Sequence, residues 1–387
     1  MAVPLKYNLR SLLVRRISTA MTGGGIALVV AVFVIVMAMV AGLNSTISDT
    51  GSPDNIIVIR RGATTETYSA IQLPQFDAMK FLPQIKRDQG GAPMASPELP
   101  VQMLMQKVGG GTDNIVMRGV LPVALEVHDK VHITAGRMFK PAVNEVIVGK
   151  GLVGRYENCK LGSTLHLGRG NWKVVGIFDA AGSSFESEVW GDIHNVQDDT
   201  QRGAYYADVR LELLPGADQA ALIQRIADDP QINLQGESEP DYYKEQAVVA
   251  NQMRVLGMIV AIIMAVGAIF GAMNTMYAAV STRTTEIGTL RALGFSPAAV
   301  MTSFLTEALM LALAAGIIGI ILAMPIDGLS TTFGNFVTFS TLAFSFQVTP
   351  RIMLEAIIFA AVMGVFGGWL PARQAMRMRV VDALRSV

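Results

Sequence analysis

Few residues in this sequence have the types and spacing that nucleotide chemistry requires. A phosphate-binding loop follows the pattern GxxxxGK[ST], in which backbone N–H groups and a lysine hold the phosphates. The pair Gly149-Lys150 comes nearest to it. It fails because Asn144 stands at the first glycine position and Gly151 at the hydroxyl position. The glycine run 109–111 has no lysine after it. We expect both segments to be turns, with no ATP hydrolysis by this chain.

A metal site and a covalent nucleophile are equally unsupported. His128 and His132 are four residues apart with Glu126 nearby, a spacing that on a helix would place ligands on one face. The apolar residues between them favour an extended or turn-like segment, so we expect no metal site. The single cysteine, Cys159, excludes an intrachain disulfide and a multi-cysteine metal centre. No serine has a GxSxG signature, so we assign no catalytic residue and expect no enzyme.

The composition is that of a membrane protein. Only 16% of residues are charged and mean hydropathy is +0.41, against about 25% charged in soluble domains. Lys+Arg and Asp+Glu are equal at 31 each, which argues against a nucleic-acid partner. The balance hides an asymmetry, because residues 44–250 hold 19 basic and 26 acidic residues. That stretch is a continuous acidic block, whereas the excess of basic residues lies beside the apolar runs.

Four apolar runs are long enough to cross a hydrocarbon core, which needs about 20 residues. They are transmembrane helix 1 at 20–43, the stalk end and helix 2 at 251–280, helix 3 at 297–323 and helix 4 at 352–372. Ser296 and Pro297 are the N-cap and first residue expected for helix 3. A cleaved signal peptide is the alternative for the first run, but the run is longer than a typical signal core and three more follow.

Basic residues near the span ends predict the orientation. They are Lys6, Arg10, Arg15 and Arg16 before the first span, and Arg373, Arg377, Arg379 and Arg385 after the fourth. Both termini are then cytoplasmic. The predicted parts outside the spans are the N-terminal segment 1–19, the outside domain 44–250, the cytoplasmic connection 281–296, the outside loop 324–351 and the cytoplasmic tail 373–387.

The acidic block is large enough to fold as its own α+β domain. Strand and helix patterns predict β-α-β halves at 55–105 and 205–236, which bracket a β-rich subdomain at 112–200. In the strand 205–213, alternation predicts that Asp208 and Arg210 face solvent. Residues 240–254 are expected to continue into helix 2 as a rigid stalk. The predicted fold class is therefore an α-helical membrane protein with four transmembrane helices and a large α+β domain inserted between helices 1 and 2.

The connection between helices 2 and 3 has the pattern Arg-Thr-x-Glu-Ile-Gly-x-x-x-Ala-Leu-Gly over residues 283–294. As physical chemistry it is a short helix with an ion pair three residues apart and an apolar strip, ended by a glycine. An ordinary amphipathic connector is the plain alternative. The residues of interest are Arg283, Glu286, Ile287, Gly288, Leu290, Ala292, Leu293 and Gly294.

This pattern resembles the cytoplasmic coupling helix of the FtsX/MacB-type ABC transporter permeases. The stretch Phe304-Leu305-Thr306-Glu307-Ala308 and the ending Pro371-Ala372-Arg373 with Asp382-Ala383-Leu384-Arg385 also resemble this family. In the acidic block, segments 136–139, 145–149 and 174–178 are similar to the family's periplasmic core domain. The similarity to MacB begins at its membrane part, so we expect this chain to carry no fused N-terminal ATPase domain.

The resemblance implies a multi-pass permease subunit in a bacterial inner membrane. It implies an ABC ATPase dimer as partner, which binds ATP and Mg²⁺, and a second permease copy or a paralogue. A periplasmic adaptor and an outer-membrane channel are further partners left open. Such proteins transmit ATP-driven motion to the periplasmic domain to export or extract substrate. The alternative is an FtsX-like signalling permease that regulates periplasmic cell-wall hydrolases.

Two further features invite a role. Glu307 is a charge inside an apolar helix, where it is costly unless it faces a partner; structural hydrogen bonding, a role in motion and proton transport are the readings for it. The segment 182–192 contains two aromatic residues among acids, and a surface turn with one buried ring is its plain reading. The alternative is a contact with a periplasmic partner, which would use Phe185, Glu186, Glu188 and Trp190.

Overall fold

The computed structural model describes residue 14, residues 16–335 and residues 340–378. Most of the predicted segment 1–19 and the end of the tail 373–387, with Lys6, Arg10, Arg15, Arg379 and Arg385, lie outside the described residues. The chain divides into two compact units. We call Met1–Gly42, Asn251–Leu329 and Ser345–Val387 the helical unit, and Leu43–Ala250 with Ser330–Phe344 the α+β unit.

The helical unit is built from long apolar helices. Its helices are α2 (Arg16–Ser48), α8 (Val248–Thr282), α9 (Thr284–Ala292), α10 (Pro297–Ala323) and α11 (Pro350–Arg377), of which α2 and α8 extend into the other unit. Among the described residues, four helical stretches are long and apolar enough to cross a membrane by length and composition: Arg16–Ser48, Glu239–Thr282, Pro297–Ile326 and Pro350–Arg377. Ser296 caps α10 by accepting a hydrogen bond from the Ala299 N–H, as its position before Pro297 predicts.

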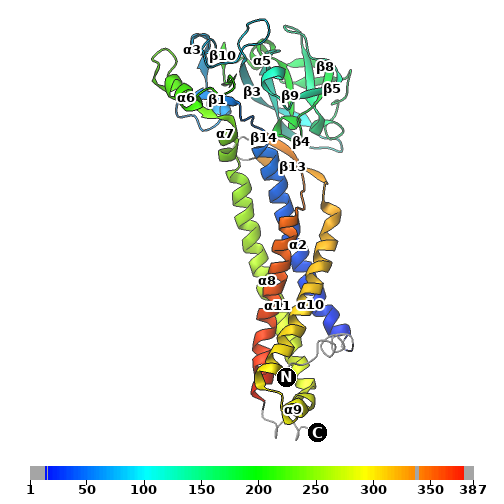
Figure 1. The fold of residues 1–387 in the computed structure, drawn as a ribbon. Coiled ribbons are helices and arrows are strands. Elements are labelled where there is room, and N and C mark those ends of the chain that lie inside the picture. The colour runs from blue at the N-terminus through cyan, green and yellow to red at the C-terminus, as the bar shows by residue number, and fades with distance from the viewer. Residues whose placement is uncertain (1–13, 15, 336–339, 379–387) are drawn as a thin grey trace. The chain divides into compact units, whose positions relative to one another are not determined.

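Small residues bring α10 and α11 close together along their length (Figure 1). A Cβ added to Gly364 would lie 2.5 Å from the Cβ of Ala312, which no real side chain tolerates. Glycine and alanine at such positions let two apolar helices pack backbone to backbone, which compensates for the absence of a hydrophobic driving force in lipid. Buried residues of α2, α8, α10 and α11 form one apolar core.

The α+β unit is dominated by one sheet. Its strands are β1 (Asn55–Arg60), β3 (Ala95–Gln106), β4 (Thr112–Val120), β5 (His132–Gly136), β6 (Glu145–Gly149), β7 (Thr164–Leu167), β8 (Gly170–Asp179), β9 (Glu188–Asp192), β11 (Asp208–Glu212) and β12 (Leu234–Ser238). Within the described residues these ten strands form a single sheet, in the order β12-β1-β11-β3-β4-β9-β6-β8-β5 with β7 beside β8. The prediction of an α+β domain is confirmed.

The remaining elements of this unit are short. They are β2 (Ile71–Gln72) paired with β10 (Tyr205–Tyr206), the helices α3 (Leu73–Met79), α4 (Ala124–Val127), α5 (Ile193–Thr200), α6 (Gln219–Asp228) and α7 (Glu239–Gln246), and the 3-10 turns η1 (Glu66–Tyr68), η2 (Lys150–Leu152) and η3 (Ser184–Ser187). The strands β13 (Ser330–Asn335) and β14 (Ser340–Ser345) form a pair within the stretch predicted as an outside loop. Residues 330–344 group with the α+β unit, and the Ala343 N–H donates to Ser187 Oγ at 2.8 Å.

The strand β3 joins what the sequence presents as two separate subdomains. Residues 95–98 pair with β11, and residues 99–106 pair with β4. Pro97 and Pro100 mark this stretch as turn-rich in sequence, because proline lacks the N–H that a central strand donates. In these registers each half of β3 is paired with a neighbouring strand on one side only. A proline nitrogen that points to the unpaired side therefore breaks no hydrogen bond of the sheet. Glu98 lies at the changeover between the two partners.

The predicted rigid stalk is interrupted. Helix α7 ends at Gln246 and α8 begins at Val248, with Ala247 between them in a turn at φ −73° and ψ 2°. The Ala247 N–H still bonds to the Tyr243 carbonyl, so the break is a local distortion rather than a loop. The expectation of one continuous helix from residue 240 therefore holds for the stretch Glu239–Thr282 apart from this one-residue distortion at Ala247.

Candidate functional site

Residues 283–294, which we call the connecting segment, form the short helix α9 and its ends, and the apolar side chains of this segment are partly buried and partly exposed. Ile287 is buried against Met276, Val280 and Phe304, and Gly288 is buried beside it. Leu293 keeps 71% of its surface exposed. Of the other predicted residues, Arg283 and Leu290 are half-buried, whereas Glu286, Ala292 and Gly294 are exposed. The segment therefore has an inner face that attaches it to the helical unit and an outer face that is free of that packing.

An ion pair ties this segment to α10. Arg283 Nη1 lies 3.0 Å from Glu307 Oε2, and Arg283 Nε lies 3.8 Å from Glu286 Oε2. Glu307 is 3% exposed, and a carboxylate is stable at such a position when a cation faces it. Of the three readings of Glu307, the geometry supports a structural ion pair that fixes the start of α9 to α10.

The aromatic residues of segment 182–192 do not reach the surface. Phe185 is 1% exposed and Trp190 is 0% exposed, although Glu186 is half-buried. The alternative reading, in which one of these rings anchors a periplasmic partner, is therefore wrong for this fold, and the plain reading of a turn with one buried ring is also wrong because both rings are buried. Both rings pack edge to face at 5.6 Å, and Phe185 lies 5.3 Å from the guanidinium groups of Arg118 and Arg210. They form the apolar side of a buried charge cluster.

Arg118 of β4 is one centre of this cluster, and its guanidinium is fully hydrogen-bonded. Nε and Nη2 donate to the two oxygens of Glu188 at 2.7 Å each. Nη1 and Nη2 donate to the two oxygens of Glu66 at 3.0 Å each. The remaining Nη1 donor binds Glu98 at 3.0 Å. All five N–H donors of the arginine are thereby used.

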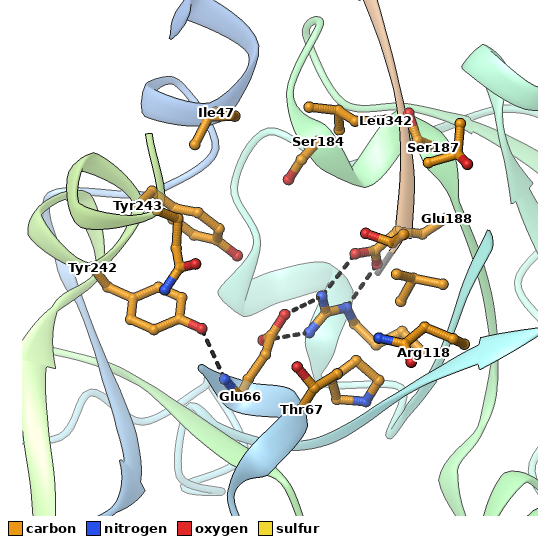
Figure 2. A pocket seen from close by; sticks show the side chains of 16 residues that line it. Ile47, Glu66, Thr67, Arg118, Ser184, Ser187, Glu188, Tyr242, Tyr243 and Leu342 are labelled. Carbon is orange, nitrogen blue, oxygen red and sulfur yellow. Dashed lines mark hydrogen bonds and ion pairs between the residues drawn. The ribbon is translucent and has the colours of Figure 1, made fainter. Parts of the chain in front are cut away.

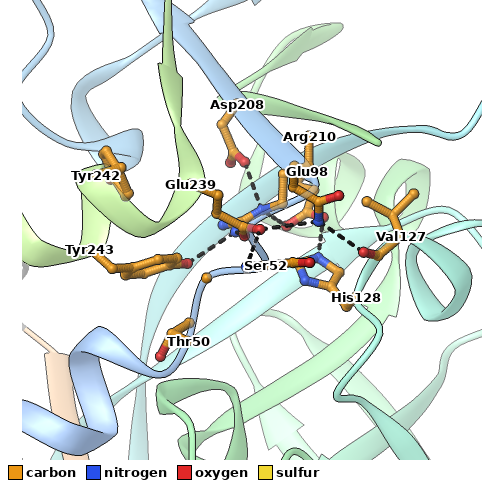
Figure 3. Close-up of polar contacts among 12 residues, drawn as sticks. Thr50, Ser52, Glu98, Val127, His128, Asp208, Arg210, Glu239, Tyr242 and Tyr243 are labelled. Carbon is orange, nitrogen blue, oxygen red and sulfur yellow. Dashed lines mark hydrogen bonds and ion pairs between the residues drawn. The ribbon is translucent and has the colours of Figure 1, made fainter. Parts of the chain in front are cut away.

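Arg210 of β11 is the second centre (Figure 3). It donates to Glu66 at 2.9 Å and to Glu98 at 3.1 Å, and it is ion-paired with Glu239. Asp208 Oδ2 lies 3.3 Å from Arg210 Nε, but neither oxygen of Asp208 accepts a hydrogen bond within the described residues. Arg210 and Asp208 are both 0% exposed. The predicted outward orientation of these two side chains is therefore wrong.

Two other side chains complete the cluster on opposite sides. The Tyr243 hydroxyl lies 3.0 Å from Arg210 Nη1 and belongs to α7. His128 Nε2 lies 2.7 Å from Glu98 Oε1, so the histidine considered for a metal site is a partner of this carboxylate. His132, by contrast, is exposed on β5. The structure does not bring the two histidines together as a ligand pair.

The environment separates the carboxylates into two kinds. Burial raises the pKa of Glu98, but Arg210, His128 and Arg118 outweigh it and hold the pKa well below its usual value. Burial likewise opposes ionisation of Glu66, yet Arg118 and Arg210 lower its pKa. Asp208 differs because burial and then repulsion from Glu66 raise its pKa well above the usual range. The cluster thus combines ionised carboxylates with one that favours the protonated form.

Glu239, the first residue of α7, holds the beginning and the end of the unit together. Its Oε2 accepts from the Ser52 N–H at 3.0 Å and from Asn55 Nδ2 at 3.1 Å. A Cβ on Gly51 would lie 2.8 Å from the carbonyl carbon of Glu239, so only glycine permits this approach. Residues 51–55 and the start of α7 are thus held together within the α+β unit.

A pocket of about 80 Å³ opens beside Arg118 (Figure 2). Glu66 and Glu188 flank the guanidinium, and Tyr242 and Tyr243 line one side. Ile47 and Leu342 add apolar surface. All of the lining residues belong to the α+β unit.

Two family models match the chain. Residues 19–229, more than half of the chain, match the MacB-like periplasmic core domain, and residues 258–380 match the FtsX-like permease C-terminal domain. The chain belongs to the MacB/FtsX-type ABC permease family. The resemblance seen in the sequence is confirmed, and the α+β unit carries most of the MacB-like match.

Relatives of this MacB/FtsX-type permease are multi-domain exporters by name. The macrolide export ATP-binding/permease protein MacB of Chlorobium luteolum is 33% identical over 264 residues, which are 64% of this chain and 38% of that protein. The pyoverdine export ATP-binding/permease protein PvdT of Pseudomonas entomophila is 31% identical over 58% of this chain and 35% of its own. The match thus spans little more than a third of the length of these relatives.

A solved structure is similar to part of the permease. The periplasmic region of MacB from Actinobacillus actinomycetemcomitans aligns with 51% of this chain and 94% of its own, at 10% identity and a TM-score of 0.39.

Proposed function

We propose that this chain is the permease subunit of an ABC transport complex and that it transmits ATP-driven motion to its periplasmic domain. A separate ABC ATPase dimer binds ATP and Mg²⁺ and docks on α9. The subunit pairs with a second copy or a paralogue. Movement of the helices changes the arrangement of the periplasmic domains, which export or extract a substrate.

The arrangement of α9 is the observation that carries this proposal. Its inner face is fixed by the buried Ile287 and by the Arg283–Glu307 ion pair, so a displacement of α9 acts on α10. Its outer face presents Glu286 and Leu293. An exposed leucine near a charge is the type of contact that a partner protein buries.

The low polarity of the helices supports motion rather than a solute path through the membrane. Glu307 is the only acidic or basic residue between Pro297 and Ala323, and it is ion-paired. A channel for polar solutes needs polar or charged lining residues. The proposed location is the bacterial inner membrane, with both termini and α9 in the cytoplasm, because basic residues flank the apolar runs there.

The test separates docking from folding. The tagged chain is purified from native membranes in a mild detergent, and co-purifying ABC ATPase is measured by mass spectrometry and ATP turnover. Leu293→Asp should reduce co-purification at least about tenfold, because it places a charge in a contact worth roughly 1.4 kcal/mol or more. Leu329→Asp is the matched control, since Leu329 is 56% exposed in the connection after α10.

Equal recovery of ATPase with the two variants would overturn docking on α9. Ile287→Asp serves as a second comparison: because Ile287 is 2% exposed, it should lower the thermal stability of the helical unit. Leu293→Asp should leave that stability unchanged.

A further inference from the structure

The groups that line the pocket beside Arg118 favour one class of ligand, and docking of an ATPase does not account for this pocket. Its volume of about 80 Å³ is several times the ~10–15 Å³ that one ordered water needs. It therefore has room for a small chemical group rather than a single water. Ile47, Leu342 and the two tyrosine rings supply apolar walls, and the polar floor is formed by Glu66, Arg118 and Glu188.

The three floor residues offer hydrogen-bond acceptors and no free donor. Every N–H of Arg118 already binds a carboxylate, so the arginine has nothing left with which to hold an anion. Glu66 Oε1 and Glu188 Oε1 each accept one hydrogen bond, both from Arg118 Nη2, within the described part of the chain. A carboxylate oxygen can accept two. Both glutamates line the pocket, and these two oxygens retain acceptor capacity.

The net charge of the cluster is negative, which also favours a ligand that donates hydrogen bonds. The cluster contains the carboxylates of Glu66, Glu98, Glu188, Asp208 and Glu239 and the guanidinium groups of Arg118 and Arg210. Even with a proton on Asp208 and another on His128, four carboxylates face three cations. Excess negative charge in a buried site is weakly screened by salt, so it favours a cationic group in the adjoining space.

We propose that this pocket binds a small organic cation, a protonated primary amine carried on a short apolar group. The ammonium donates to Glu66 Oε1 and Glu188 Oε1, which are acceptors of the kind a Lys-like –NH₃⁺ requires. The apolar group lies against Ile47, Leu342 and the tyrosine rings, and aromatic faces attract cations. This site belongs to the α+β unit alone and does not depend on ATPase docking.

Butylammonium is the probe, titrated into the full-length chain in a neutral detergent at low ionic strength by calorimetry. Butanol has a similar apolar tail without the charge, and butyrate carries the opposite charge. Butylammonium should bind at least about tenfold more tightly than either, because a charged hydrogen bond is worth about 1.5–3 kcal/mol, or roughly 10–100-fold. Equal affinity for butanol would show an apolar cavity only and would overturn the proposal.

Two variants locate the binding. Thr67→Trp fills the pocket from η1 without altering a carboxylate, and it should abolish butylammonium binding. Tyr68→Trp is its matched control on the same turn, because Tyr68 is 57% exposed and does not line the pocket. Glu188→Gln should weaken binding about tenfold or more. Binding that survives Thr67→Trp unchanged would place the cation elsewhere and overturn the assignment.

Discussion

Arg283, just before α9, and Glu307, in α10, form a buried ion pair across 24 residues of sequence, with 3.0 Å between Nη1 and Oε2. The Arg283 side chain is 12% exposed and that of Glu307 is 4% exposed, so water screens the pair little. The short connection and the long helix are therefore held as one mechanical element at this end.

A double-mutant cycle should show this linkage. Removing one partner leaves a buried charge and typically costs about 3–5 kcal/mol. Glu307→Ala and Arg283→Ala should each lower the thermal stability of the chain in detergent, and the double variant should lose less than the sum of the two losses. Additive losses would mean that the two residues act independently.

The pH dependence of stability should report on Asp208. Because burial raises its pKa above the unfolded value, the folded state holds the proton more tightly. The resulting stabilisation is complete below the unfolded pKa and is lost as pH rises through the folded pKa. A tenfold difference in proton affinity between the folded and unfolded states is worth about 1.4 kcal/mol.

Asp208→Asn should therefore match the parent chain near pH 4 and be more stable at pH 8, by about 1 kcal/mol or more. Melting temperatures between pH 4 and pH 9 measure the difference. Asp129→Asn is the control, because Asp129 is exposed. If the stabilities of the parent chain and of Asp208→Asn change with pH in parallel, the pKa of Asp208 is not raised in the folded state and the prediction is wrong.

Glu239→Ala should loosen the contact between residues 51–55 and the start of α7. The change removes the acceptor of Ser52 N and Asn55 Nδ2 and one partner of Arg210. Loss of about 3 kcal/mol is expected, since a buried cation loses one of its counter-ions. Urea unfolding and protease cleavage near residues 50–55 measure it. Glu237→Ala, two residues earlier and half-buried, should change neither by more than about 0.5 kcal/mol.

The purified chain should release no phosphate from ATP, because no segment of its sequence has the GxxxxGK[ST] pattern. Malachite-green detection of phosphate provides the measurement, with a sample that retains the co-purified ATPase as the positive control. Turnover by the chain after the ATPase has been removed would contradict the proposed division of labour.

Cysteine labelling should separate the two sides of the membrane. The native Cys159 is buried and is replaced by serine. In that background, Thr112→Cys should react with an impermeant maleimide in intact spheroplasts, and Thr289→Cys should react only after permeabilisation. Both threonines are exposed in the fold. Equal labelling in intact cells would reverse the proposed orientation of α9.

Local signals explain which parts of the fold could be predicted. The strand β1 has a continuous apolar run that is buried on both faces, and α10 begins at a Ser-Pro pair that fixes its cap. Each pattern depends on residues within a few positions of one another. The same holds for the connecting segment 283–294, whose ending at Gly294 follows from that residue's positive φ of 94°.

The charge cluster could not be predicted because its partners are distant in sequence. Glu98 and Arg210 are 112 residues apart, and Arg118 and Glu188 are 70 apart. Alternating polar residues in β11 are the usual mark of a solvent-facing side. Here Glu239 and Tyr243 of α7 cover that side, which turns an apparent surface into an interior. Leu293 and Ile287 both belong to the segment 283–294, and the sequence does not tell which of the two is exposed. The fold shows that Leu293 is exposed and Ile287 is buried.

The contact of Glu239 with residues 51–55 also bears on how this part of the protein can be exchanged. A folded body whose two chain ends emerge at one place can be grafted into a loop of another protein without stretching the host. Ser52, Asn55 and Glu239 give this body such a seam. A laboratory chimera that replaces residues 51–239 together with residues 330–344 on the same set of helices therefore keeps this seam in one piece.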